Sequence, residues 1–222
     1  MSNQTTPTLR TDLPPLPERM AKLPLSPKGY PVPWFVQWVD GVPDFRIVEH
    51  GKFERAHKHG LCWLCGERLG RYKSFVAGPM CGINRTSSEP PSHLDCARFA
   101  AMGCPFLSTP AAVRNERGME NTIEPAGVAI KRNPGVAMVW TTTKYDVYRV
   151  PNGYLVEMGP PEHVLWYAQG RTATRDEVEA SISSGLPVLE QIARDESVAA
   201  EKSLEQMIND FEQWLPDMEV AA

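Results

Sequence analysis

The sequence has no long hydrophobic run and no recognisable export signal. Among its 222 residues, no apolar stretch approaches the ~20 residues that a transmembrane helix needs. Residues 1–17, MSNQTTPTLRTDLPPLP, do not join a basic segment to a hydrophobic one, as a secretory signal does. Hydrophobic residues at 42% and charged residues at 23% are nevertheless sufficient for a buried core. We therefore expect a globular protein of the cytoplasm with no membrane partner.

Cysteine is scarce and its number is odd, which argues against a disulfide framework. Without an export signal, the five cysteines are expected to stay reduced. Cysteine and histidine are also unevenly distributed, because eight of the ten residues of these two types lie between His57 and Cys104. In reduced proteins such a cluster more often holds a metal ion. Zinc is therefore the first hypothesis.

Two short motifs in this region have the spacing of zinc ligands. Cys62 and Cys65 form a C-x2-C pair, and Gly66 permits the tight turn that brings two thiolates to one ion. His93 and Cys96 stand three positions apart at the start of a predicted helix, so their side chains share one face. Four protein ligands close a tetrahedral shell. The pattern therefore predicts a structural Zn2+ rather than a catalytic one.

The remaining cysteines and histidines leave alternatives open. Cys81 could replace His93 as the fourth ligand. His57 and His59 could also form a second metal site with either Cys81 or Cys104. A simpler interpretation makes Cys104 a small buried hydrophobic residue at the end of a helix.

Residues 60–103 resemble the treble-clef zinc-finger group, in which a knuckle, a β-hairpin and a helix share one ion. The resemblance implies that the knuckle and the first helical turn supply all four ligands. It also implies a hairpin over Leu69–Met80 with its turn at Gly78-Pro79. The stretch GPMCGINRTSSEPPSH, residues 78–93, is similar to a phrase shared by uncharacterised bacterial and phage proteins. That second similarity implies no known activity.

The motifs of familiar enzyme classes are absent. The chain contains no G-x-S-x-G, no GK[ST] phosphate loop, no GxGxxG and no H-E-x-x-H. A His-Me-finger (HNH) nuclease needs a histidine base between its two ligand pairs, yet residues 66–92 contain neither histidine nor aspartate. A zinc deaminase needs P-C-x-x-C, which is also missing. The sequence therefore favours a protein that is not an enzyme, and it identifies no catalytic residue.

Charge is distributed unevenly along the chain and favours a contact with nucleic acid. From Arg46 to Arg85, eight basic residues stand against three acidic ones, whereas from Thr174 to the end twelve acidic residues stand against three basic ones. Basic and aromatic side chains on the predicted hairpin could meet phosphates and stack on bases. The residues predicted to do so are Arg68, Arg71, Tyr72, Lys73 and Arg85.

A polar loop between residues 81 and 93 allows a second interpretation. It carries Asn84, Ser87, Ser88 and Glu89 near the start of the predicted helix. Such a loop could bind a phosphate or another small ligand, and an enzyme acting on a nucleotide or a nucleic acid would have its site here. The simpler interpretation is that these side chains cap the helix and support the zinc thiolates.

Turn and capping signals predict an α+β fold with antiparallel β-hairpins, the zinc module and a C-terminal helical hairpin. Asp40-Gly41 predicts strands near 34–39 and 44–48, and the turn at 151–153 predicts a hairpin between YDVYRV and YLVEM. Thr174 and Glu177 form a capping box that starts the first C-terminal helix. Gly185 is expected to end that helix, and Leu186-Pro187 to open the next.

Composition divides the chain into three parts. Eight of the first 33 residues are proline, which predicts an extended strap or a disordered leader over 1–33. Residues 34–170 are expected to form a β-rich domain that contains the zinc module 57–107, and residues 171–222 the C-terminal helices. The apolar stripe over 188–215 packs on the protein's own sheet or binds a protein partner or a second copy. Together these features predict a zinc-stabilised binding protein, with nucleic acid ahead of a protein as its partner.

Overall fold

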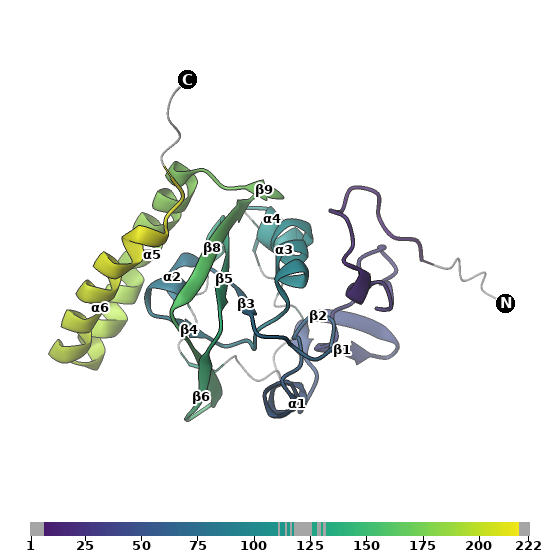
Figure 1. Cartoon of the computed structure of the whole chain (residues 1–222), viewed down its shortest axis with the longest axis horizontal. Coiled ribbons are helices and arrows are strands. Elements are labelled where there is room, and N and C mark those ends of the chain that lie inside the picture. The colour runs from purple at the N-terminus through teal and green to yellow at the C-terminus, as the bar shows by residue number, and fades with distance from the viewer. Residues whose placement is uncertain are drawn as a thin grey trace, which may run out of the picture.

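Helices and antiparallel strands form the expected α+β fold in the computed structural model (Figure 1). The structure describes residues 7–110, 112–113, 115, 117, 126–127, 130 and 132–217. Two short hairpin sheets flank a larger sheet, and a pair of helices closes the C-terminal side. The first elements along the chain are a 3-10 turn (Glu18–Met20), β1 (Val36–Val39), β2 (Val42–Val48) and α1 (Lys52–His59).

A four-stranded antiparallel sheet lies at the centre of the molecule. Its strands, in spatial order, are β3 (Lys73–Ala77), β5 (Ala137–Thr142), β8 (Pro161–Ala168) and β9 (Arg171–Thr172). Every residue of β5 is buried, because both faces of the sheet are covered. Met138 and Trp140 face α5 (Arg175–Glu196) and α6 (Val198–Phe211), whereas Ala137 and Val139 face α3 (Leu94–Gly103). This alternation follows from the two-residue period of a strand.

Both hairpins expected from turn signals are present. Asp40 and Gly41 have φ of 48° and 78°, the left-handed conformations that a tight hairpin turn between β1 and β2 requires. β2 begins at Val42, two residues earlier than expected. β6 (Tyr145–Val150) and β7 (Gly153–Met158) form the second hairpin, and β4 (Thr86–Ser87) pairs with the free side of β7.

The hairpin expected over Leu69–Met80 is wrong. Within that range only β3 is a strand, and its partner is β5, with Phe75 opposite Trp140. Pro79 does not belong to a hairpin turn but opens α2 (Pro79–Ile83). Proline lacks an N–H, and the first N–H groups of a helix have no partner within the helix, so Gly-Pro suits a helix start as well as a turn.

The expected boundary between the two C-terminal helices is also wrong. α5 continues through Gly185 and Pro187 and ends at Glu196. Arg132 lies against Gly185, and a Cβ at position 185 would be 2.5 Å from a nitrogen of its guanidinium group. This contact explains why a glycine occupies the position. Pro187 is on the exposed side of the helix. Proline has no N–H, so one carbonyl of the preceding turn lacks its helical hydrogen bond, and on this side that carbonyl can be solvated. The real break is at Ser197, whose hydroxyl accepts the Ala200 N–H at 3.0 Å and caps α6.

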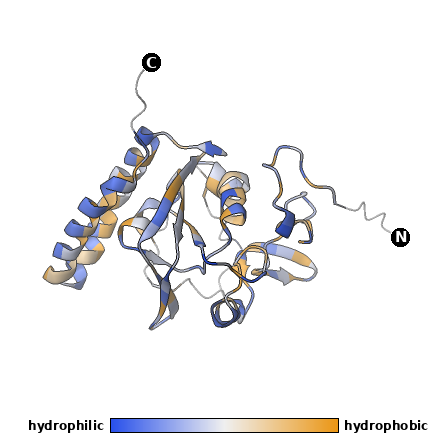
Figure 2. Cartoon of the chain, in the orientation of Figure 1, coloured by the Kyte–Doolittle hydropathy of each residue, from blue (hydrophilic) through white to orange (hydrophobic). Residues whose placement is uncertain are grey.

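The C-terminal helices turn their apolar sides toward the central sheet. Figure 2 shows hydrophobic and hydrophilic colours on both α5 and α6, as amphipathic helices require. The buried members of their stripe, in the same core as β5, are Val178, Leu189, Ala193, Leu204 and Phe211. Packing on the protein's own sheet, one of the two alternatives for this stripe, is therefore confirmed. Among the described residues, no helix has both the length and the apolarity that a membrane crossing needs.

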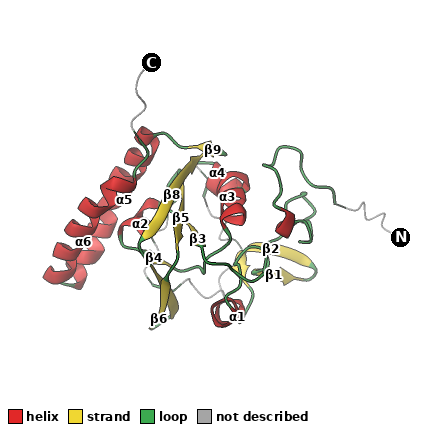
Figure 3. Cartoon of the chain, in the orientation of Figure 1, coloured by secondary structure: helices red, strands yellow, loops and turns green. Residues whose placement is uncertain are grey.

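The described part of the proline-rich segment is a strap that packs on the rest of the molecule. Figure 3 shows it as loop, apart from one short helical turn. Met20 and Val32 are buried, with exposed fractions of 2% and 1%. Trp34, directly after the strap, donates its N–H to the Leu64 carbonyl at 2.8 Å. The described residues 7–33 therefore lie against the rest of the molecule in the arrangement of a strap.

Candidate metal centre

The first two ligands lie on a tight turn, the knuckle, formed by residues 60–69. The Cys62 N–H donates to the Glu67 carbonyl at 2.7 Å, and the Gly66 N–H donates to the Cys62 carbonyl at 2.9 Å. Gly66 has φ of +75°, which glycine adopts without strain. Its α-carbon also lies against the ring of Trp34, where a Cβ would be 2.6 Å from Cδ1. Both observations explain why a glycine follows Cys65.

The other two ligands lie at the start of α3. His93 is the N-cap residue and Cys96 is in the first turn. Ser92, directly before the N-cap, pairs with Ser74 of β3 through two backbone hydrogen bonds of 2.7 and 2.9 Å. The Ser74 hydroxyl in turn bonds Thr141 Oγ1 of β5 at 2.9 Å. The central sheet therefore positions the N-terminus of α3 beside the knuckle.

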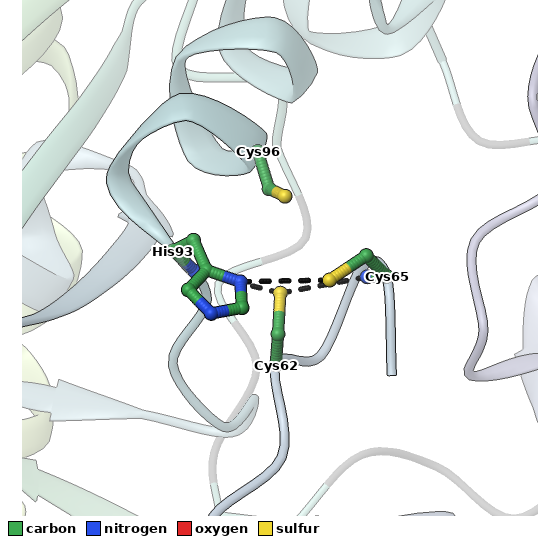
Figure 4. A group of neighbouring side chains, drawn as sticks. All are labelled: Cys62, Cys65, His93 and Cys96. Carbon is green, nitrogen blue, oxygen red and sulfur yellow. Dashed lines mark hydrogen bonds between the residues drawn. The ribbon is translucent and has the colours of Figure 1, made fainter. Parts of the chain in front are cut away.

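The four ligand side chains point toward one another (Figure 4). Their ligand atoms all lie within 4.8 Å of one another, and Cys65 Sγ is 3.5 Å from His93 Nδ1. In a tetrahedral site with Zn–S bonds of ~2.3 Å, neighbouring sulfurs are about 3.8 Å apart. Shifts of at most about 1 Å would close the observed cluster around an ion of this size. The cluster could therefore hold a metal ion.

His93 is oriented by the knuckle. Its Nε2 lies 2.9 Å from the Arg68 carbonyl oxygen. Because a carbonyl only accepts, Nε2 carries the proton, and the lone pair of Nδ1 faces the sulfurs. Metal-binding histidines commonly have their second nitrogen held in this way. Arg68 therefore contributes to the centre through its backbone.

Cys62 is the thiol most prepared to ionise. The N–H groups of Cys65 and His93 both donate to its sulfur at 3.4 Å. Hydrogen bonds from the Cys65 and Cys96 thiols lower the pKa of Cys62. The same bonds raise the pKa of the two donors, that of Cys65 to about 11 and that of Cys96 in the same direction. The Cys62 thiolate likewise raises the pKa of His93. Because a metal binds cysteine as thiolate, a bound dication would displace thiol protons from the cluster.

Apolar side chains enclose the cluster. Cys62 and Cys96 are 0% exposed and share a small core with Met20 of the strap. Other strap residues that pack against this core are Leu13, Leu16 and Leu23. A shell of this kind restricts the access of water to the sulfurs.

Ion pairs add to the contact between the strap and the centre. Arg19 donates through Nε to Asp95 at 2.9 Å, and its Nη1 lies 3.6 Å from Glu67. Lys22 also pairs with Glu67. Since Asp95 lies in the first turn of α3 and Glu67 in the knuckle, the strap joins both halves of the centre.

The remaining cysteines and histidines of the described residues join no further group of three or more ligand atoms. Within the described ranges, the four residues above are the only group of three or more with converging ligand atoms. Cys81 is in α2 and packs against the main core, and Cys104 follows α3. His57 contacts Tyr145 edge-on, with ring centroids 6.2 Å apart. The structure thus brings His93, not Cys81, to the knuckle and forms no second cluster from these residues.

A depression of about 370 Å³ opens beside the centre at the start of α3. Of the residues expected to meet nucleic acid, Arg71 and Tyr72 line it. Tyr72 is 48% exposed, and the Arg71 guanidinium lies 5.6 Å from the centroid of its ring. Arg68 is exposed on the knuckle, and Lys73 donates through Nζ to the Arg71 carbonyl at 2.8 Å.

Two further arginines line the same depression and were missed from the sequence. Arg98 lies one helical turn after Leu94, another lining residue, so the helical period could have indicated it. Arg19 belongs to the strap and has no such local signal. Only the docking of the strap brings it near Arg71.

Arg85 is in a different place from the other predicted basic residues. It follows α2 with φ of 53° and lines a second cavity, of about 520 Å³. The charged residues that line this cavity with it are Asp146, Glu157 and Asp210. These carboxylates offset its charge, so the structure does not add Arg85 to the basic group at α3.

The polar side chains of the loop 81–93 mainly stabilise the loop itself. Asn84 Oδ1 accepts the Thr86 N–H at 3.0 Å. The Ser87 hydroxyl donates to the Glu89 carbonyl at 2.9 Å and accepts the Glu89 N–H at 3.0 Å, while Ser88 is exposed. These bonds close local turns, so the expectation that the side chains cap α3 or support the thiolates is wrong.

Comparisons with protein-family models, with curated proteins and with solved structures gave no match. The likeness to treble-clef modules accordingly depends on residues 60–103 alone.

Proposed function

We propose that the cluster is a structural zinc site and that the protein is a zinc-stabilised, treble-clef-like module that binds nucleic acid. Three thiolates and one imidazole are a soft donor set of the kind that selects Zn2+. With four protein ligands, no coordination position is left for a reactive water. The observation that carries the metal assignment is the approach of all four ligand atoms to within 4.8 Å of one another.

Replacement of a ligand tests the zinc assignment. We expect Cys62→Ser to lose its metal and to melt far below the parent protein, because structural zinc contributes about 10–16 kcal/mol in small zinc modules. Cys104→Ser is the matched control, since Cys104 lies outside the cluster. Elemental analysis and thermal melts provide the two readouts. A Cys62→Ser protein that keeps stoichiometric zinc and the parental melting temperature would overturn the assignment.

The observation that supports nucleic acid as the partner is the set of three arginines and one exposed tyrosine around a single depression. Arg19, Arg71 and Arg98 supply guanidinium groups, which match phosphate geometry better than lysine does. Tyr72 offers a ring on which a base can stack. The zinc centre would hold this surface rigid, because His93 joins the loop that precedes Arg71 to the start of α3.

The salt dependence of binding tests this proposal. Because Arg19 is paired with Asp95 and Glu67, a single strand whose phosphates meet Arg71 and Arg98 should bind with a log–log salt slope of about −1.4, since each contact contributes about −0.7. Arg71→Ala should weaken binding and reduce the slope by about 0.7. Arg149→Ala, an exposed arginine on β6, removes the same charge outside the depression and should change neither quantity much. Absence of binding at low salt, or equal effects of the two substitutions, would contradict the proposal.

A further inference from the structure

The depression at the start of α3 is shallow and open to solvent, so it has no wall that would stop a strand. Arg19 is already paired with Asp95 and with Glu67. Among the described lining residues, Arg71 and Arg98 are the arginines that form no ion pair. A strand that meets these two guanidinium groups can therefore continue past the edge of the depression.

The knuckle connects this depression to the C-terminus of α1. His93, which lines the depression, bonds the Arg68 carbonyl oxygen through Nε2 at 2.9 Å. Arg68 also pairs with Leu61 in an antiparallel bridge, and the Leu69 N–H donates to the Gly60 carbonyl at 2.8 Å. Because Gly60 is the C-cap residue of α1, Arg68 lies between the depression and the last turn of this helix.

Basic side chains on α1 and the knuckle carry charge that is left for a ligand. Arg55, Lys58 and Arg68 are all exposed. In the part of the chain that the structure describes, none of them forms an ion pair or a side-chain hydrogen bond. The guanidinium carbon of Arg55 lies 5.9 Å from the ring centroid of Trp34, a contact that leaves its positive charge in place.

The charges of α1 lie close together on its surface. Arg55 and Lys58 are three positions apart, so their side chains are neighbours on the helix. Glu54, the acidic residue of α1, forms an ion pair with neither of them among the described residues. Basic residues in a last turn also offset the helix dipole, but that dipole amounts to only about half a charge. Most of the charge of Lys58 therefore remains available to a phosphate.

Cations without a carboxylate partner thus follow one path over α3, the knuckle and α1. In order along this path, the five are Arg98, Arg71, Arg68, Lys58 and Arg55. A positive surface that tracks the backbone is how proteins hold single strands without sequence preference. Resting on the function proposed above, we infer that a single-stranded nucleic acid crosses this path as a continuous strand, so that the protein binds the interior of a strand rather than its end.

The salt dependence of a long strand tests how many cations it meets. A thymidylate dodecamer, titrated into the full-length zinc-loaded protein, should bind with a log–log salt slope of about −3.5, since each of the phosphate contacts contributes about −0.7. A strand held by the depression alone would give about −1.4. A thymidylate trimer has only two phosphates between its nucleosides, so its slope should stay near −1.4 and provides the comparison.

Substitution of Lys58 tests whether the strand reaches α1. Lys58→Ala should weaken binding of the dodecamer about two- to tenfold and reduce its slope by about 0.7, because one phosphate contact is lost. Lys202→Ala is the matched control and should change neither quantity, since Lys202 is an exposed lysine on α6, which Figure 1 shows well away from α1.

A circular thymidylate strand tests whether an end is needed. It has no terminus, so binding of the interior predicts an affinity close to that of a linear strand of the same length.

The outcomes distinguish this inference from the function on which it rests. A dodecamer slope near −1.4, equal effects of Lys58→Ala and Lys202→Ala, or failure of the circular strand to bind would each overturn the continuous path. These results would leave nucleic-acid binding at the depression in place. Absence of binding by every strand at low salt would overturn both.

Discussion

Gly66→Ala tests how closely the knuckle is fitted to its surroundings. The substitution has two costs: Gly66 has φ of +75°, and a Cβ would lie 2.6 Å from Trp34 Cδ1 and 2.7 Å from Cγ. The left-handed conformation costs alanine about 1–2 kcal/mol. The overlap with the ring adds about 1–3 kcal/mol, the usual cost of overpacking. We therefore expect the free energy of unfolding to fall by about 2–5 kcal/mol.

The ring of Trp34 cannot move aside easily, so its overlap with a Cβ at position 66 should lower the free energy of unfolding. Lys52 Nζ lies 4.2 Å from its ring centroid, and the Arg55 guanidinium carbon lies 5.9 Å from it. Displacing the ring would disturb both contacts. The alternative, displacing Gly66, would move the adjacent ligand Cys65 and weaken the metal site.

Gly60→Ala is the matched control at the other end of the knuckle. Gly60 has φ of +59°, but no atom lies within 4 Å of the position of its Cβ. This variant therefore has the conformational cost alone, about 1–2 kcal/mol. Urea unfolding of the zinc-loaded proteins measures both values, and competition with a chelator measures metal affinity. If Gly66→Ala were no less stable than Gly60→Ala and bound metal equally well, the contact with Trp34 would not be the reason for this glycine.

Two more substitutions test the strap and the C-terminal helices. Met20→Ala should cost about 2–5 kcal/mol in urea unfolding, because Met20 is 2% exposed and packs against the metal-binding cysteines; an unchanged midpoint would mean that the strap contributes little. Arg171 and then the Thr174 N–H lower the pKa of Glu177 from 4.5 to about 2. This carboxylate therefore stabilises the fold above pH ~4.5, and its contribution is lost as the pH falls from 4.5 through about 2. Glu177→Gln should lose about 1 kcal/mol at pH 7 and flatten the acid side of the stability curve, whereas an acid side identical to the parent's would contradict this role.

Local signals predicted local structure correctly. Asp40-Gly41 and Asn152-Gly153 each lie at the hairpin turn that their sequence favours, and Thr174 with Glu177 forms the capping box. In each case the deciding interaction joins residues only a few positions apart. A spacing rule can describe such interactions without knowledge of the fold.

The predictions that failed concern segments whose structure is decided by residues far away in the sequence. The strand Lys73–Ala77 pairs with β5, more than sixty positions away, and not with a neighbour across Gly78-Pro79. Gly185 and Pro187 are helix breakers by propensity, yet α5 continues because Val178 before them and Leu189 and Ala193 after them are buried in the main core. Burial of these side chains offsets the ~1 kcal/mol by which glycine and the ~3 kcal/mol by which proline disfavour a helix.

The sequence by itself determined two ligand pairs, Cys62 with Cys65 and His93 with Cys96, because one turn or one helical turn brings each pair together, but it left Cys81 open as an alternative to His93. Only the tertiary structure decided what lies around them. Arg19, Arg71 and Arg98 come from the strap, a loop and a helix, and they meet because burial of Met20 docks the strap onto the centre. Apolar burial has no direction and acts between residues at any separation along the chain, so no short motif records it.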